Sequence, residues 1–468
     1  MNPAQLQAHI DETWTTSIVP ALERYIRIPA QSSRYDVDWE KNGYIDEAVE
    51  LAKAWVDARG LPGATSEVLR LPGRTPVLLV ERAGERPGTI LLYGHLDKQP
   101  PFTGWREGLG PWTPVLTPEG KLYGRGASDD GYAVFASVAA LEALLAQGQT
   151  LPRIVVLIEC SEESGSPDLP AHLDALGDRL GQPDLVVCLD SGAGDYERLW
   201  MTTSLRGLVG GELSVKVLEN GVHSGDASGV VASSFRIARA LLERLEDATT
   251  GRIKLPELHT AIPESRALDA KRAGAILGDQ VWSKFPFVAG MGPVEADATE
   301  MILARTWRPA LAVTGADGLP SSATAGNVLR PETRLRLSLR LPPTVDADKA
   351  VKAVVSALTS DPPYGAQVSF DGEGGAAGWN APELSPWLTK AIDDASRQFY
   401  GKPSGAISEG GSIPFMGMLG ERFPRAQFLI TGVLGPESNA HGPNEFLHVP
   451  YAMKLTACVA HVVGVFPG

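Results

Sequence analysis

Histidine and acidic side chains follow three short apolar runs of this sequence. The runs and the groups after them are 89–93 before His95 and Asp97, 154–158 before Glu162 and Glu163, and 185–189 before Asp190. In open α/β sheets, sites form beyond the carboxyl ends of the strands, so neighbouring strand ends would bring these groups together. Because burying that many carboxylates without cations is costly, the pattern predicts a metal site at one edge of a sheet.

The spacing inside two of these groups suggests separate roles for neighbouring side chains. Asp97 lies two residues after His95 and could accept the ring N–H that a metal-bound histidine leaves free. Glu162 and Glu163 are adjacent, so their side chains point in different directions. One can bind a metal ion while the other acts as a base on a metal-bound water. A solvated acidic loop is the alternative, which we disfavour because the pair directly follows a buried-type strand.

A glycine-rich stretch with two acids lies between the first two runs. Residues 122–131 read LYGRGASDDG and precede an apolar segment that we expect to be a helix from about Tyr132 to Ala146. A helix start with Ser128 or Asp129 as N-cap explains the stretch. A carboxylate held rigidly at that point could also bridge two metal ions, and the two interpretations are compatible.

The elements that position these groups form a predicted α/β unit. The runs at 154–158 and 185–189 are almost wholly apolar, which is typical of strands covered on both faces of a mostly parallel sheet. Helical spacing from Ile45 to Val56, with Gly60 as a stop signal, predicts a covering helix. Helical and apolar-strand patterns return at the end of the chain.

The middle of the chain has a different pattern. Residues 212–217 and 334–341 alternate polar and apolar side chains, which predicts strands with one wet face. A strong helical pattern at about 233–246 lies between them, and the glycine-rich run 371–375 marks a hinge. We therefore predict an α+β lid domain, residues 206–378, inserted into a catalytic domain made of residues 1–205 and 379–468.

The overall composition restricts the classes of function. The chain has 468 residues, a net charge of −14 and 43% hydrophobic residues, which fits a soluble two-domain protein. The negative charge argues against a nucleic-acid-binding surface, and no apolar run is long enough to span a membrane. We expect no secretory signal. The three cysteines, Cys160, Cys188 and Cys458, are too few and too widely spaced for a disulfide framework. We therefore expect a cytoplasmic protein.

Together these residues resemble the dinuclear zinc peptidases that include carnosinase, cytosolic dipeptidase, glutamate carboxypeptidase and succinyl-diaminopimelate desuccinylase. The resemblance covers nearly the whole chain. Its further motifs are His223-Ser224-Gly225, Asn327-Val328, Ser338-Leu339-Arg340, Ser408-Glu409-Gly410-Gly411-Ser412-Ile413-Pro414 and His441. The dipeptidase branch is most similar, because Asp rather than Glu stands at position 190 and the lid is long. The implied fold is an α/β catalytic domain, with helices on both faces of a mostly parallel mixed sheet, and an α+β lid that dimerises.

The resemblance implies a site for two divalent metal ions. Zinc is the expected metal, and manganese or cobalt would fit the same ligands. Each ion would have two ligands of its own and share a third, namely His95 and Asp190 for one ion, Glu163 and His441 for the other, and Asp129 as the bridge. The peptide bond from Asp129 to Asp130 would be cis. Asp97 would orient His95, and Glu162 would be the general base.

The resemblance also implies residues that contact the substrate. His223 of the partner subunit would stabilise the tetrahedral oxyanion, so a homodimer through the lid is expected. Arg340 would bind the substrate's terminal carboxylate with its guanidinium fork. Asn327 and the Gly410-Gly411-Ser412 turn would add polar contacts. The alternative for Arg340 is an exposed strand residue like Arg334 and Arg336, and the binding role rests on the resemblance more than on the pattern.

Some positions depart from the pattern of these peptidases. Gly131 replaces the lysine that commonly follows the two aspartates, and Lys98 replaces a commonly apolar residue. Cys160-Ser161 stands where glycine and a variable residue are usual. We expect Lys98 near the mouth of the site, where it would affect substrate preference. Five further histidines match no motif and are expected to be structural, namely His9, His172, His259, His448 and His461.

The implied function is metal-dependent cleavage of dipeptides or short peptides with a free C-terminal carboxylate, as in dipeptidases and carboxypeptidases. Hydrolysis of N-acyl amino acids is the main alternative, because it needs the same chemistry and a different pocket. An inactive binding protein is disfavoured, since Glu162 and all five ligands are present. A nucleotide-binding protein is disfavoured because Gly124-x-Gly126 lacks both a P-loop lysine and a third glycine.

Overall fold

The first unit of the protein is built on a six-stranded sheet with a parallel centre. The computed structural model describes residues 1–411 and 414–468. The strand order is β1-β2-β6-β3-β7-β17, in which β6, β3, β7 and β17 are parallel and β1 and β2 form an antiparallel edge. The strands are β1 (Ala64–Leu69), β2 (Val77–Arg82), β3 (Thr89–His95), β6 (Arg153–Glu159), β7 (Leu185–Cys188) and β17 (Gln427–Ile430).

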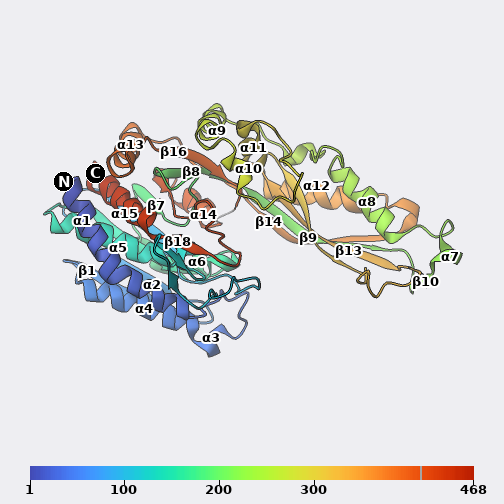
Figure 1. Cartoon of the computed structure of the whole chain (residues 1–468), viewed down its shortest axis with the longest axis horizontal. Helices are drawn as coiled ribbons and strands as arrows, with labels where there is room; N and C mark the ends of the chain where they lie inside the picture. The colour runs from blue at the N-terminus through green and yellow to red at the C-terminus, as the bar shows by residue number, and fades with distance from the viewer. Residues whose placement is uncertain (412–413) are drawn as a thin grey trace.

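Helices cover both faces of this sheet, because its central strands are apolar on both sides. Ile90 and Leu92 of β3 enter the larger core, and Leu91 and Tyr93 enter the smaller one. The helices of the larger core are α1 (Pro3–Thr13), α2 (Val19–Arg27), α4 (Tyr44–Arg59), α5 (Tyr132–Ala146), α13 (Pro386–Tyr400) and α15 (Val449–Gly464). On the other face lie α6 (Leu169–Leu176) and α14 (Pro414–Arg422). The predicted fold class and the predicted helix α5 are confirmed (Figure 1).

Two small sheets complete the first unit. One has the order β15-β8-β16, formed by β15 (Trp379–Asn380), β8 (Trp200–Leu205) and β16 (Gly405–Glu409). The other has the order β18-β5-β4, formed by β18 (Phe446–His448), β5 (Lys121–Tyr123) and β4 (Val115–Leu116). The pairing of β18 with β5 brings the end of the chain beside the glycine-rich stretch 122–131. The short helix α3 (Trp39–Asn42) precedes α4.

A second, antiparallel unit has its own sheet and core. Its strand order is β11-β13-β9-β14, from β9 (Gly207–Lys216), β11 (Ala310–Asp317), β13 (Glu332–Leu341) and β14 (Gln367–Ala376). The inward side chains of β9 and β13 pack on α8 (Ser234–Leu245) and α12 (Ala347–Thr359), which explains the alternation in their sequences. At the far tip of this unit lie β10 (Val222–His223), α7 (Ser224–Ala227) and β12 (Val328–Leu329), the last paired with β10 (Figure 1).

Three helices between β10 and β13 pack on the first unit. They are α9 (Glu264–Leu277), α10 (Gln280–Ser283) and α11 (Ala298–Thr306). Ala273 and Ile302 belong to the larger core of the first unit, and the indole N–H of Trp307 donates to Oγ of Ser408 in β16 at 3.1 Å. The range 206–378 therefore contributes to both units. Within the described ranges, no helix combines the length and apolar character needed to cross a bilayer.

Candidate metal centre

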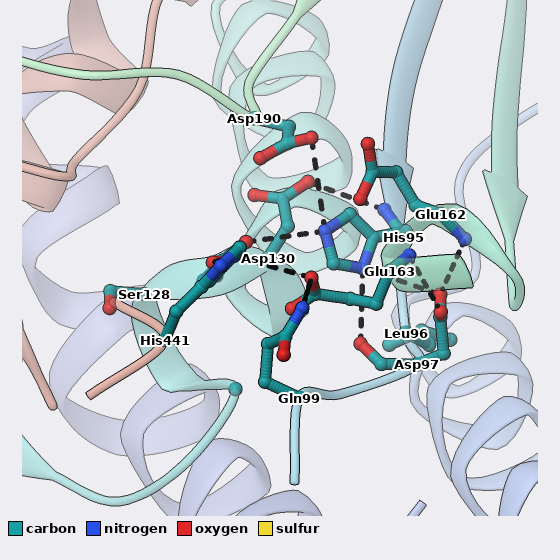
Figure 2. Close-up of polar contacts among 12 residues, drawn as sticks. His95, Leu96, Asp97, Gln99, Ser128, Asp130, Glu162, Glu163, Asp190 and His441 are labelled. Carbon is teal, nitrogen blue, oxygen red and sulfur yellow. Dashed lines mark hydrogen bonds and ion pairs between the residues drawn. The ribbon is translucent and has the colours of Figure 1, made fainter. Parts of the chain in front are cut away.

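Four of the predicted site residues lie beyond the carboxyl ends of neighbouring parallel strands. β3 ends with His95, β6 ends with Glu159 just before the turn of Glu162 and Glu163, and β7 ends two residues before Asp190. β3 pairs with β6 on one side and with β7 on the other. The side chains therefore meet at one edge of the sheet, as the strand pattern predicts (Figure 2).

The first candidate ligand group consists of His95, Asp129 and Asp190, whose ligand atoms lie within 4.8 Å of one another. Nε2 of His95 is 3.3 Å from Oδ1 of Asp129 and 3.8 Å from Oδ2 of Asp190. All three side chains are buried. Nε2 of His95 has no hydrogen-bond partner in the described part of the chain. A buried ring nitrogen between two carboxylates is the geometry of a histidine ligand.

The second candidate ligand group consists of Asp129, Glu163 and His441, again within 4.8 Å. Nε2 of His441 is 3.0 Å from Oδ2 of Asp129 and 3.3 Å from Oε2 of Glu163. Asp129 thus faces His95 with one carboxylate oxygen and His441 with the other. The structure brings all five predicted ligands together, in two groups that share Asp129.

The turn that carries Asp129 is held against β3 by glycines. Gly126 has a φ of +81° and Asp129 is joined to Asp130 by a cis peptide bond. A Cβ on Gly94 of β3 would lie 2.6 Å from Oδ2 of Asp130, so only glycine lets the turn approach this closely. The backbone N–H of His95 donates to Oδ2 of Asp130 at 3.3 Å. The turn thereby holds Asp129 beside His95 and starts α5.

Asp97 lies behind His95 and reaches both glutamates. Nδ1 of His95 is 3.1 Å from the carbonyl oxygen of Asp97 and 3.4 Å from its Oδ1. The carboxylate of Asp97 also accepts the backbone N–H groups of Glu162 at 3.1 Å and Glu163 at 3.0 Å. Asp97 is wholly buried. Its contacts fix the turn that carries the two glutamates as well as the ring of His95 (Figure 2).

The electrostatics of the centre favour bound cations. Burial raises the pKa of Asp190 to about 7, where His95 opposes the shift and the charges of Asp129 and Glu163 add to it. Burial and the charge of Asp190 also raise the pKa of Glu162. Oε1 of Glu163 is buried without a partner in the described part of the chain. Imidazole and carboxylate ligands suit zinc and related divalent ions, so this donor set fits a metal.

A cleft of about 540 Å³ joins the two units at this centre. Its lining includes Glu162, Glu163 and His441 from the first unit and Arg340 from β13 of the second. Arg340 is partly buried, and this burial lowers its pKa. Arg340 thus lines the same cleft as Glu162, and a role in binding substrate stays a prediction.

His223 and Asn327 lie away from the ligand groups of their own chain. His223 ends β10, and its Nδ1 accepts the backbone N–H of Gly225 at 3.1 Å. Asn327 directly precedes β12, and its carbonyl oxygen accepts the N–H of Ser224 at 2.9 Å. Both residues are exposed at the far tip of the antiparallel unit (Figure 1). They lie next to each other, which the sequence did not predict.

The predicted glycine turn lies next to a buried arginine. Arg206 donates its backbone N–H to the carbonyl oxygen of Gly411 at 3.0 Å. Its side-chain Nε–H donates to the carbonyl oxygen of Gly410, also at 3.0 Å. Ser412, the third predicted residue of the turn, lies outside the described residues. The contacts of Gly411 are therefore with Arg206 rather than with either ligand group.

The prediction that Lys98 lies at the mouth of the site is wrong. The side chain of Lys98 is wholly buried, and its ammonium group points to the end of α2. Its aliphatic chain packs in the space that Gly126 leaves free, and its ammonium group donates hydrogen bonds to backbone carbonyl oxygens. The lysine is therefore part of the scaffold beneath the centre.

Two supporting contacts were missed by the sequence analysis. Glu445, four residues after His441, pairs with Arg125 at 2.7 Å and accepts the side-chain hydroxyl of Ser128 at 2.9 Å. Gln99 donates to Oε2 of Glu163 at 2.6 Å. Arg125 stands inside the glycine-rich stretch, but nothing in the sequence connects it with an acid more than 300 residues away.

The five remaining histidines belong to neither ligand group. A ring nitrogen of His172 contacts the carbonyl oxygen of Thr75 at 2.9 Å, and one of His259 contacts that of Ile253 at 2.8 Å. His448 accepts the N–H of Tyr451 at the start of α15. His9 lies 3.9 Å from Glu142, and His461 meets the ring of Phe399 edge-on. These contacts agree with structural roles.

Comparison with known proteins identifies the family of this chain. The model of the family described as Peptidase family M20/M25/M40 matches residues 91–464. The chain belongs to this family. All five candidate ligands, together with Glu162 and Arg340, lie in the matched segment. The protein is thus an enzyme, a metallopeptidase of the M20/M25/M40 family, as the resemblance implied.

Individual relatives agree with this assignment. The chain is 29% identical to a cysteinylglycine-S-conjugate dipeptidase of Corynebacterium striatum over 428 residues, covering 86% of this chain and 88% of that protein. It is 28% identical to the human Beta-Ala-His dipeptidase over 384 residues, covering 79% and 73%. Among solved structures, the dipeptidase Dug1p of Saccharomyces cerevisiae has a TM-score of 0.80 at 21% identity, covering 100% and 99%. Human carnosine dipeptidase 1 has a TM-score of 0.77 at 22% identity, covering 99% of both chains. At these identities the solved structures support the fold of this M20/M25/M40 peptidase.

Proposed function

We propose that this protein is a metal-dependent dipeptidase that cleaves the amide bond of dipeptides or short peptides with a free C-terminal carboxylate. The observation that carries the proposal is the cleft, where Glu162 and the ligand groups sharing Asp129 face Arg340. The relatives named as dipeptidases support the same substrate class.

The proposed mechanism assigns the metals to the two ligand groups. His95 and Asp190 would hold one divalent ion, Glu163 and His441 a second, and Asp129 both. When bound, such ions polarise a scissile carbonyl and lower the pKa of an attacking water. Zinc is the proposed metal, and manganese or cobalt suits the same donors.

The remaining steps use the chain's own groups. The carboxylate of Glu162 takes a proton from the attacking water and later gives it to the leaving amine. Asp97 holds both Glu162 and His95 in place through the contacts described above. Arg340 binds the terminal carboxylate of the substrate across the cleft, and Gly411 and Ser412 contribute polar groups. The two charged walls thus place the amide bond between Arg340 and the ligand groups.

The proposal includes a homodimer. His223 and Asn327 lie together at an exposed tip. In the proposed symmetric dimer this tip would enter the cleft of the other chain. There, His223 of the partner subunit would stabilise the oxyanion. We assign residues 1–205 and 379–468 to the catalytic domain and 206–378 to the inserted lid through which the chains associate, with α9, α10 and α11 of the lid packed on the catalytic domain. The proposed location is the cytoplasm, and the proposed substrates are small peptides or N-acyl amino acids.

The test is an assay of the purified protein on dipeptides, their C-terminal amides and N-acyl amino acids, each with a chelator and with metal added back. Cleavage of dipeptides that needs metal and is lost on amidation is the expected result. Preference for N-acyl amino acids would assign the protein as an amidohydrolase instead. Absence of any metal-dependent cleavage would overturn the proposal in favour of a binding protein.

A further inference from the structure

Lys98 is a buried lysine beneath the candidate metal centre. Its side chain is wholly inaccessible, and Nζ donates to the carbonyl oxygens of Tyr25 at 2.7 Å and Ile28 at 2.8 Å. A third carbonyl oxygen, that of Ile26, lies at 3.4 Å. These oxygens belong to the last turn of α2 and the residue after it. The three N–H donors of an ammonium group match the three acceptors.

The surroundings of Nζ favour a positive charge without a carboxylate partner. Nζ lies 3.9 Å from the centroid of the Tyr25 ring and 5.4 Å from that of Trp112, and aromatic faces attract cations. The C-terminal end of α2 adds partial negative charge from its carbonyl groups. Burial lowers the pKa of Lys98, and the charge of Glu445 opposes that shift. The cation is therefore held by a helix end and two rings.

The segment around Lys98 carries contacts to ligands of both groups. The backbone N–H of Lys98 donates to the carbonyl oxygen of Ala30, and its carbonyl oxygen accepts the N–H of Ser32, both at 2.9 Å. The residue before it, Asp97, contacts His95, and the residue after it, Gln99, contacts Glu163. Main chain and side chain of Lys98 thus fasten residues 95–99 to residues 25–32.

Lys98 also supports the turn that carries Asp129. A Cβ on Gly126 would lie 2.8 Å from Cγ and Cε of Lys98, so the lysine chain fills the space beneath this glycine. At the other end of the turn, a Cβ on Gly131 would lie 2.1 Å from the ring of Tyr25. Tyr25 therefore occupies the space that a side chain at 131 would need. Gly131 and Lys98 are therefore connected through Tyr25, whose ring contacts the Lys98 ammonium group and fills the space beside Gly131.

We infer that Lys98 is a positioning residue of the metal centre. Its buried cation joins the 95–99 segment and the 126–131 turn to the end of α2, and so sets the spacing between His95, Asp129 and Glu163. The inference rests on the proposed function, because it concerns the same centre. It adds to that function a residue that touches neither metal nor substrate.

The test is Lys98→Met, which keeps an unbranched side chain one atom shorter than lysine and removes the charge. Calorimetry on the chelator-treated protein should show zinc and manganese binding weakened by about 10- to 100-fold, as for residues that orient metal ligands. At saturating metal, kcat should fall while KM for a dipeptide changes little. Because the calorimetry needs no substrate, it tests Lys98 even if the wild-type protein cleaves no dipeptide.

A matched control is Arg82→Met. Arg82 is also a buried cation held by carbonyl oxygens, those of Pro62 at 3.1 Å and Ala83 at 3.0 Å, and it pairs in addition with Glu85 at 3.1 Å. It lies on β2, away from both ligand groups. This variant should lose stability and keep its metal affinity. Lys98→Gln retains amide donors for the same carbonyl groups and so folds even where Lys98→Met does not. Wild-type metal affinity in Lys98→Gln, or in a folded Lys98→Met, would overturn the inference.

Discussion

At the scale of single residues, the neighbours Glu162 and Glu163 have different surroundings. Their backbone N–H groups share the carboxylate of Asp97. The carboxylate of Glu163 contacts His441 and Gln99 and belongs to a ligand group. Glu162 belongs to neither ligand group but lines the cleft beside them. One glutamate is thus placed to bind metal and the other to face substrate.

This difference gives the first prediction, for Glu162→Gln. The amide cannot accept a proton, so kcat should fall by about 100-fold or more, the usual contribution of a general base. Metal content measured by atomic emission should be unchanged, because Glu162 is not in either ligand group. Glu257→Gln, a change at an exposed acid of the antiparallel unit, is the control. Near-normal turnover of Glu162→Gln would remove this residue from its role.

Arg340 gives a prediction about the substrate. Arg340→Met should raise KM for a dipeptide by about 10- to 100-fold, because a hydrogen bond to a charged group contributes about 1.5–3 kcal/mol. The C-terminal amide of the same dipeptide, already a poor substrate, should show little further loss. Arg334 lies on the same face of β13 but pairs with Glu332 at 3.3 Å, so Arg334→Met is the matched control. An equal increase in KM for the dipeptide and for its amide would argue against binding of the substrate carboxylate by Arg340.

At the scale of elements, the order of strands was harder to predict than their positions. The apolar runs 89–93, 154–158 and 185–189 identify β3, β6 and β7, because strands covered on both faces need apolar side chains throughout. On the assumption that these three strands are neighbours, the groups at their ends were predicted to form one site. The packing of α9 and α11 on the first unit was not visible, since a helical pattern shows which face is apolar but not which core it enters.

The loops that carry ligands are joined by a buried ion pair, that of Arg125 and Glu445. Both side chains are almost inaccessible, and Glu445 also accepts the N–H groups of Gly126 at 3.1 Å and Ser128 at 3.3 Å. The pair therefore connects the turn before Asp129 with the loop after His441. No local pattern reveals such a contact, because its partners are far apart in the sequence and meet only through the pairing of β5 with β18.

We predict that Glu445→Gln lowers the free energy of unfolding of the metal-free protein by about 3 kcal/mol or more, since it leaves the charge of Arg125 buried without its partner. Urea unfolding followed by circular dichroism measures this change. Lys53→Met removes a surface pair with Asp57, 2.6 Å apart, and should cost less than about 1 kcal/mol. A loss as small for Glu445→Gln as for Lys53→Met would show that the pair does not hold the loops together.

At the scale of the whole molecule, the exposed tip lies at the end of the antiparallel unit that points away from the first unit (Figure 1). The five predicted ligands and Arg340 meet within the chain, whereas His223 and Asn327 do not join them. A single sequence cannot distinguish a residue that acts in its own chain from one that acts in a partner. The antiparallel unit separates its tip from the cleft of its own chain, which is why we propose that His223 acts in the partner subunit.

Mixing two inactive variants tests whether chains share sites. In a symmetric dimer of His223→Ala with Glu162→Gln, the cleft of the His223→Ala chain has an intact Glu162 and receives His223 of the partner subunit. After equal mixing and full exchange, about a quarter of wild-type activity should return, since half of the dimers are mixed and each has one intact site. Mixing His223→Ala with a chain that carries both changes is the control, because no intact site can form. Mass spectrometry of differently tagged chains verifies exchange, and exchanged chains without recovered activity would exclude a site shared between subunits.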